Sequence, residues 1–158
     1  MQKIYGATAR QDGLYKIGRS KWELIYGFGT DGDNNGYNWR KRFDHQPTID
    51  EIKSAVISTI NAATEEKILT GFKWDGLPVW LSTENQINYL NIARDAGVVY
   101  PLCLKLGEDA EGLPQYRTFD TAADFDKFNT AATAHVRACI TAGWQEKDSV
   151  DWKLFATH

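Results

Sequence analysis

The first 46 residues alternate apolar and polar positions in the way that half-buried strands do. Every second position of 22–28 carries a large apolar side chain: Trp22, Leu24, Tyr26 and Phe28. In 37–43 the same spacing gives Tyr37, Trp39 and Phe43. Each set is therefore expected to lie on one face of a strand. The Gly, Asn and Asp residues of 29–36 suit the positive φ angles of a hairpin loop. Weaker strand patterns at 3–8 and 14–17 predict a meander of three or four strands.

Beyond Pro47 the pattern changes to helical spacing. Thr48 is a candidate N-cap with Glu51 three residues later, which is the spacing of a capping box. Apolar residues then recur every three or four positions: Ile49, Ile52, Val56 and Ile60. Gly71 is a plausible end for this helix. The turn Asp75-Gly76 between 72–74 and 77–79 predicts a two-residue β-hairpin, the strongest local signal in the chain.

A second helix is predicted from Thr83, with Gln86 completing a capping box and with Ile87 and Leu90 at helical spacing. A second hairpin follows, formed by 102–106 and 115–119. The last long helix is expected to begin at Thr121 and to end at Gly143. The tail 144–158 holds Trp144, Trp152 and Phe155, so we expect it to pack against the domain.

These elements predict an α+β fold: an N-terminal antiparallel β-meander followed by helix-hairpin-helix-hairpin-helix. The corresponding division is an N-terminal β subdomain at 1–46 and an α+β domain at 47–158.

Charge and composition exclude several classes of partner. A formal charge of −3 argues against nucleic acid, because binding phosphates needs a basic face. No apolar run approaches the roughly 20 residues of a membrane span, and no secretory signal opens the chain. Two cysteines do not make a disulfide framework. We therefore expect synthesis in the cytoplasm, with two reduced, buried thiols and no membrane partner.

The loop 31–36 resembles the first half of a calcium loop, with Asp31, Asp33 and Asn35 at alternating positions and Gly36 at the turn. The resemblance fails five residues after Gly36, where Arg42 stands in place of the required glutamate. We therefore expect a plain hairpin turn, with no metal and no cofactor. Arg40 and Arg42 lie between Trp39 and Phe43 like a single-strand-binding patch, but alternation favours a solvated face in which both arginines point to water.

No cluster of side chains predicts catalysis. His135 and Cys139 lie one helical turn apart, yet a nucleophile pair needs a third, orienting group that nothing here supplies. Glu65 and Glu66 are helix neighbours that point apart, so they do not form a glycosidase pair. We accordingly expect no enzyme and name no catalytic residue.

Aromatic residues are the main remaining signal, and they support either a ring-rich core or an adhesive surface. Six rings could form a sugar-stacking platform, although core packing is favoured: Trp22, Tyr26, Tyr37, Trp39, Trp74 and Trp80. Trp80 and Tyr116 are expected to face outward. In the first hairpin, Trp80 should project with Lys73 and Pro78 from the face opposite the apolar one. These four residues form the predicted interaction surface.

From residue 57 to residue 152 the chain resembles an uncharacterised domain that recurs in phage tail-fibre-type and prophage proteins. Four stretches carry the resemblance: the start at 60–62, 67–72 with the aromatic-Asp-Gly hairpin, the helix start at 84–86, and the closing 142–148. The family has no established activity, so the resemblance implies context only. It implies a tail-associated structural or interaction protein, which binds other phage or prophage proteins or itself, and it leaves open incorporation into a virion after synthesis in the cytoplasm. The alternatives are a carbohydrate-binding module that grips a surface glycan and a cell-wall hydrolase.

Overall fold

The computed structural model describes residues 1–32 and 34–156, which form two compact units. Unit 1 comprises Met1–Ala62 and Glu146–His158, and unit 2 comprises Ala63–Gln145. The secondary structure is α+β, as the sequence predicts. Helix α1 (Ile49–Thr70) contributes its first 14 residues to unit 1 and the rest to unit 2. The division into subdomains at residue 47 stays a prediction.

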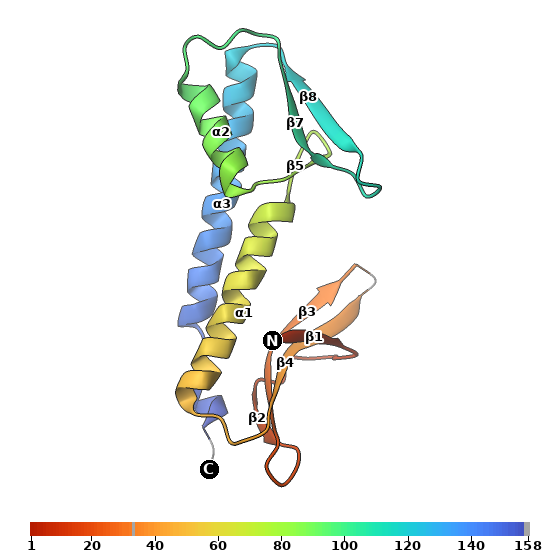
Figure 1. Cartoon of the computed structure of the whole chain (residues 1–158), viewed down its shortest axis with the longest axis vertical. Coiled ribbons are helices and arrows are strands. Elements are labelled where there is room, and N and C mark those ends of the chain that lie inside the picture. The colour runs from red at the N-terminus through yellow and green to blue at the C-terminus, as the bar shows by residue number, and fades with distance from the viewer. Residues whose placement is uncertain (33, 157–158) are drawn as a thin grey trace. The chain divides into compact units, whose positions relative to one another are not determined.

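Unit 1 contains one antiparallel sheet of four strands (Figure 1). The strands are β1 (Gln2–Tyr5), β2 (Gly13–Lys16), β3 (Trp22–Asp31) and β4 (Asn35–Phe43). Their order is β1-β4-β3-β2, so β2, β3 and β4 form a meander, and β1 pairs with β4 rather than with its neighbour in sequence. All three pairings are antiparallel.

A β-bulge reverses the alternation of β3 in its second half. Tyr26 pairs with Trp39, but the next pair is Gly29 with Tyr37, so β3 holds one residue more than β4 here. Phe28 consequently leaves the face of Tyr26 and is 41% exposed, and the expectation that it shares that face is wrong. Side chains bind the backbone at the bulge: Asn38 Nδ2 donates to the Gly27 carbonyl at 2.5 Å, and Asp12 Oδ1 accepts from the Gly27 N–H at 2.7 Å.

The core of unit 1 joins this sheet to α1 and to the end of the chain. The capping box of α1 is confirmed, because Thr48 Oγ1 accepts from the Glu51 N–H and the Glu51 carboxylate accepts from the Thr48 N–H. The packing of the tail is confirmed at the 3-10 helix η1 (Trp152–Phe155), whose Phe155 is buried, but not at Trp144, which is 61% exposed. Together these elements bury Leu24, Tyr26, Phe43, Ile52, Ala55, Val56, Ile60, Val150 and Phe155.

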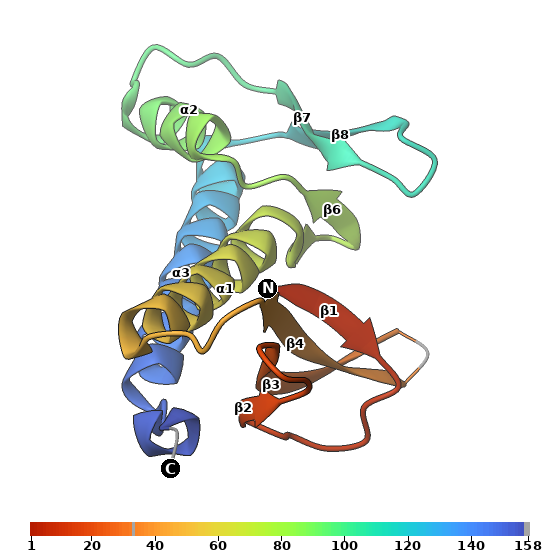
Figure 2. The same cartoon turned by 60° about the horizontal axis from the view of Figure 1, so that its bottom comes forward.

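Two hairpins form the β structure of unit 2, and Figure 2 shows strand β6 of the first and both strands of the second. In the first, β5 (Phe72–Trp74) pairs antiparallel with β6 (Leu77–Val79), as predicted. Its turn residues Asp75 and Gly76 have φ angles of 49° and 81°, as a type I′ turn requires. The second hairpin, also as predicted, pairs β7 (Leu102–Glu108) with β8 (Pro114–Phe119). The Trp80 N–H donates to the Leu106 carbonyl and so joins the two hairpins.

The other helices of unit 2 begin at polar caps. Helix α2 (Thr83–Arg94) begins at Thr83, and its N-cap is Ser82. The capping box predicted for Thr83 and Gln86 therefore placed the N-cap one residue too late. Ser82 Oγ accepts from the Asn85 N–H, while the Gln86 side chain donates to the Leu81 carbonyl in place of closing a capping box. Helix α3 (Ala122–Asp148) begins after Thr121, whose Oγ1 accepts from the Asp124 N–H as predicted.

The core of unit 2 is aromatic and centres on Phe128 of α3, whose side chain is fully buried. Five rings lie 5.0 to 6.3 Å from its centroid: Phe72, Trp74, Tyr89, Phe119 and Phe125. They come from both hairpins, from α2 and from α3 itself. Contacts at these distances add to the stabilisation that burial of large rings provides.

The sequence suggests that helix α3 ends at Gly143. This is wrong, because the helix continues to Asp148. Gly143 is buried against α1, where a Cβ atom would lie 2.5 Å from Thr64 Oγ1. Because α1 approaches so closely, the position requires a residue without a side chain. The glycine therefore serves helix packing and not helix termination.

We predict that Gly143→Ala lowers the free energy of unfolding by about 1–3 kcal/mol, because the added methyl group overpacks the contact with Thr64. In an unobstructed helix the same change would stabilise by about 1 kcal/mol. Thr64→Ala removes the obstructing atoms, so the double variant should recover most of the loss. Chemical denaturation of the two single variants and the double variant measures this coupling, and additive effects would contradict it.

Two buried tyrosines differ in the partner of the hydroxyl group. Tyr26, 3% exposed, donates to Glu146 Oε1 at 2.5 Å within unit 1. Tyr89, 2% exposed, has a buried hydroxyl group without a hydrogen-bond partner among the residues that the structure describes. Burial raises the pKa of both phenols, and for Tyr26 the hydrogen bond to Glu146 raises the pKa further.

The same substitution at these two positions should have opposite effects. Tyr26→Phe removes a hydrogen bond to a partly exposed carboxylate and should destabilise unit 1 by about 1 kcal/mol. Tyr89→Phe removes a buried polar group without a partner and should leave stability unchanged or raise it by up to about 1 kcal/mol. Denaturant midpoints of the two variants test the contrast. A clear loss at Tyr89 would mean that its hydroxyl is bonded in solution.

Candidate functional site

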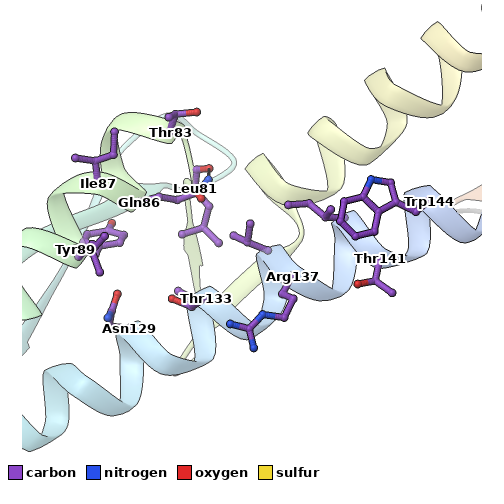
Figure 3. Close-up of a pocket in the computed structure, with 14 residues that line it drawn as sticks. Leu81, Thr83, Gln86, Ile87, Tyr89, Asn129, Thr133, Arg137, Thr141 and Trp144 are labelled. Carbon is purple, nitrogen blue, oxygen red and sulfur yellow. Dashed lines mark hydrogen bonds between the residues drawn. The ribbon is translucent and has the colours of Figure 1, made fainter.

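An open groove of about 490 Å³ lies between α2 and α3 in unit 2. Figure 3 shows Thr133, Arg137, Thr141 and Trp144 following one another along α3, across from Thr83, Gln86 and Ile87 of α2. The complete lining is Leu81, Thr83, Gln86, Ile87, Tyr89, Leu90, Asn129, Ala132, Thr133, Val136, Arg137, Ile140, Thr141 and Trp144. We refer to this feature as the α2–α3 groove.

Three apolar residues of the α2–α3 groove are exposed, while Leu81, Tyr89 and Ala132, which also line it, are buried. Ile87 is 54% exposed, Leu90 40% and Trp144 61%. Threonine, asparagine and glutamine side chains complete the lining, so that apolar and polar groups combine as they do in an interface core with its rim. Sequence patterning identified Ile87 and Leu90 at helical spacing, but it did not identify a groove. The available signal was Tyr89, which lies between them in the sequence but on a different side of the helix. If the side with Tyr89 is turned to the core, the side with Ile87 is left exposed.

Among the residues that the structure describes, Arg137 is the one charged side chain that lines this groove. It is exposed, and it makes no hydrogen bond or ion pair with any residue of 1–32 or 34–156. The groove thus combines a mostly apolar wall with a single positive charge that has no carboxylate partner.

The predicted interaction surface lies around a second hollow of about 640 Å³ in unit 2. Trp80 and Pro78 line this hollow, and Trp80 is 47% exposed. Lys73 pairs with Pro78 across the first hairpin, and Tyr116, 60% exposed, pairs with the lining residue Lys105 across the second. The outward orientation of Trp80 and Tyr116 is confirmed, while their role in an interface stays a prediction.

The polar face of the unit 1 sheet is organised by Glu23, which is 8% exposed. Its carboxylate lies 2.9 Å from Arg42 Nε and 3.4 Å from Arg40 Nη1. The side chain of Arg42 is 78% exposed, as expected, but that of Arg40 is only 29% exposed. The expectation that both arginines point to water is therefore wrong for Arg40, because a buried glutamate needs a cation beside it.

His135 and Cys139 do come together, but in a geometry that gives the thiol no base. His135 Nε2 lies 3.0 Å from the Lys67 carbonyl oxygen and 3.5 Å from Cys139 Sγ. A carbonyl oxygen only accepts, so Nε2 must carry a proton to bond with it. That nitrogen then has no lone pair with which to accept the proton of Cys139. The expectation of two buried thiols is wrong, because Cys103 is exposed and Cys139 is only partly buried.

Asp31 of the proposed calcium loop is engaged by protein groups. Lys3 Nζ lies 3.3 Å and Tyr5 Oη 2.5 Å from its carboxylate oxygens. The hydrogen bond from Tyr5 is the main reason why the pKa of Asp31 is lowered. Asp33, the second candidate ligand, lies outside the described residues. Within the residues described, no three His, Cys, Asp or Glu side chains are grouped so as to hold a metal ion.

The six rings of the possible sugar platform belong to different surroundings. Tyr26 is in the core of unit 1, and Trp22 packs against that core. Trp74 packs against the core of unit 2. Tyr37 and Trp39 lie under Lys3 Nζ, at 4.4 and 5.6 Å from the ring centroids. Of the six, only Trp80 is largely exposed.

Comparison with known proteins identifies the family. Residues 51–157 match the model of DUF4376, a domain of unknown function. The chain belongs to the DUF4376 family. No curated protein and no solved structure matches it.

The α2–α3 groove and the hollow beside Trp80 both lie within the part of the chain that DUF4376 covers. Strands β1 to β4 precede the matched residues. In the described part of this DUF4376 chain, no helix is both long enough and apolar enough to cross a membrane.

We predict that Trp80→Ala leaves the DUF4376 fold cooperative and changes the free energy of unfolding by less than about 1 kcal/mol, because half of the side chain is exposed. Phe128→Ala is the matched comparison and should cost about 3–5 kcal/mol through the cavity that it creates. Thermal and denaturant unfolding measure both. A loss for Trp80→Ala as large as that for Phe128→Ala would make Trp80 a core residue.

Proposed function

We propose that this DUF4376 chain is a protein-interaction protein without catalytic activity. The observation that carries the proposal is the α2–α3 groove, in which exposed Ile87, Leu90 and Trp144 lie together on one face of unit 2. Exposed apolar surface of this kind is unfavourable in water, and it commonly marks the site where another protein binds. Aromatic side chains such as Trp144 are enriched at such sites.

The chemistry of the groove favours binding over catalysis. A hydrolase needs a nucleophile or an activated water, together with a base at hydrogen-bond distance. The groove offers one arginine among threonine, amide and apolar side chains. The Cys139 thiol has no base at His135, as its geometry requires Nε2 to be protonated.

The biological setting that we propose is a phage or prophage tail. The resemblance of 57–152 to a domain of tail-fibre-type proteins supports it. In that setting the chain would bind another tail or assembly protein, and the surface around Trp80 would serve as a second contact. The genes that flank this one are an independent indicator, since tail, capsid or lysis genes beside it would agree with the proposal.

Site-specific photo-crosslinking tests the interaction. A photoreactive phenylalanine derivative replaces Trp144 in the α2–α3 groove, Trp80 in the hairpin, or Lys127 as a control on α3 outside the groove. The chain is produced in cells in which the phage assembles, and adducts are identified by mass spectrometry. We expect a defined adduct with a tail protein from position 144 or 80 and none from 127. Absence of protein adducts at both test positions would contradict the proposed function.

A carbohydrate-binding module is the alternative. Tyr5, 49% exposed, lies 5.8 Å from Tyr37 in an edge-to-face pair on the sheet of unit 1. Such a pair offers a small aromatic surface to a sugar ring. A glycan array separates the two functions, because specific glycan binding that is lost in Tyr5→Ala would favour the module.

A further inference from the structure

We propose that the α2–α3 groove receives an amphipathic helix of a partner protein, and that this helix presents a carboxylate to Arg137. The inference rests on the proposed function and names the kind of segment that the groove accepts. It is carried by the length of the groove, by the arrangement of its apolar side chains, and by the charge of Arg137.

The length of the groove suits a helix. Along α3 its lining runs from Asn129 to Trp144, which spans about 22 Å at 1.5 Å per residue. A partner helix of about four turns would lie along that distance. The apolar side chains on α3 recur every four residues: Ala132, Val136, Ile140 and Trp144. Ridges formed at this spacing pack into the grooves of another helix.

A small apolar ligand fits the groove less well. Sites for small molecules enclose most of the ligand surface. Here Ile87 and Trp144 are more than half exposed, and they stand on opposite walls. An amphipathic helix would cover these walls with its apolar face and leave its polar face in contact with water.

The charge of the groove selects the partner. Arg137 has no carboxylate within hydrogen-bond distance in the described chain, and binding of an apolar helix alone would remove its guanidinium from water without compensation. A Glu or Asp on the partner helix removes that penalty, because guanidinium and carboxylate groups form paired hydrogen bonds. The partner helix is therefore expected to be apolar on one face with an acidic residue at its edge.

A second copy of the chain does not supply this carboxylate through the same surface. Residues 129–144 of α3 contain no Asp and no Glu. If two copies packed groove on groove along α3, Arg137 would meet neutral or positively charged side chains. This argues for a different protein as the occupant.

A charge-swap selection tests the inference with the full chain. A displayed library of peptides of about 16 residues, with apolar positions fixed at helical spacing and the others randomised, is selected separately on wild type and on Arg137→Glu. We expect wild type to enrich peptides with an acidic residue at one position, and Arg137→Glu to enrich Lys or Arg there. An enriched acidic peptide should bind Arg137→Glu at least about ten-fold more weakly, and changing its acid to Lys should restore binding to that variant.

Two further variants locate the binding site. Ile87→Asp changes an exposed wall residue and should abolish peptide binding, while circular dichroism shows an unchanged fold. Arg94→Glu changes an arginine of α2 that does not line the groove, and it should leave the affinity within about two-fold, which controls for net charge.

Two outcomes would overturn the inference: enriched peptides without an acidic preference, or equal binding to wild type and Arg137→Glu. Self-association in ultracentrifugation that Ile87→Asp removes would also overturn it, in favour of a second copy. The first two results are compatible with crosslinks from position 144 to a tail protein, and the third with an adduct between two copies of the chain, so the inference can fail while the proposed function stands. Absence of any protein adduct at 80 and 144 would instead remove the proposed function.

Discussion

The burial of Phe128 is the constraint on which the rest of unit 2 depends. Its ring is fully buried, and it contacts rings from both hairpins, from α2 and from α3. Phe72 and Phe119, which are distant in sequence, both pack against this side chain. Because short hairpins are marginally stable by themselves, their attachment to this cluster is what makes them part of a domain.

The same constraint creates the α2–α3 groove. Tyr89 lies 5.0 Å from Phe128 in an edge-to-face contact, and this contact fixes the rotation of α2 about its axis. Successive residues of a helix are rotated by about 100°, so Ile87 lies about 200° from Tyr89, on the opposite side of α2, and Leu90 lies about 100° from it, at the edge of the side that faces the core. Both are consequently exposed beside α3. The exposed apolar wall thus follows from the packing of Tyr89 of α2 into the aromatic cluster.

Unit 1 is held together by a different balance of forces. Its apolar core joins sheet, helix and tail, but polar side chains determine the details of the sheet. Asn38 and Asp12 bind the backbone at the bulge, and Glu23 places Arg40 along the polar face. Without such partners a buried polar group would destabilise the fold. These contacts set the exposure of Phe28 and Arg40.

The sequence by itself determined the local structure: the Asp75-Gly76 turn, the capping box of Thr48 and Glu51, the order of the helices and hairpins, and the outward positions of Trp80 and Tyr116. Each follows from residues within a few positions of one another. Only the tertiary structure decided that Gly143 is a packing residue, that the bulge turns Phe28 outward, and that Ile87, Leu90 and Trp144 line one groove with Arg137. These features depend on contacts such as Gly143 with Thr64 and Tyr89 with Phe128. Local patterning cannot determine them, because the partners are brought together only when the helices pack.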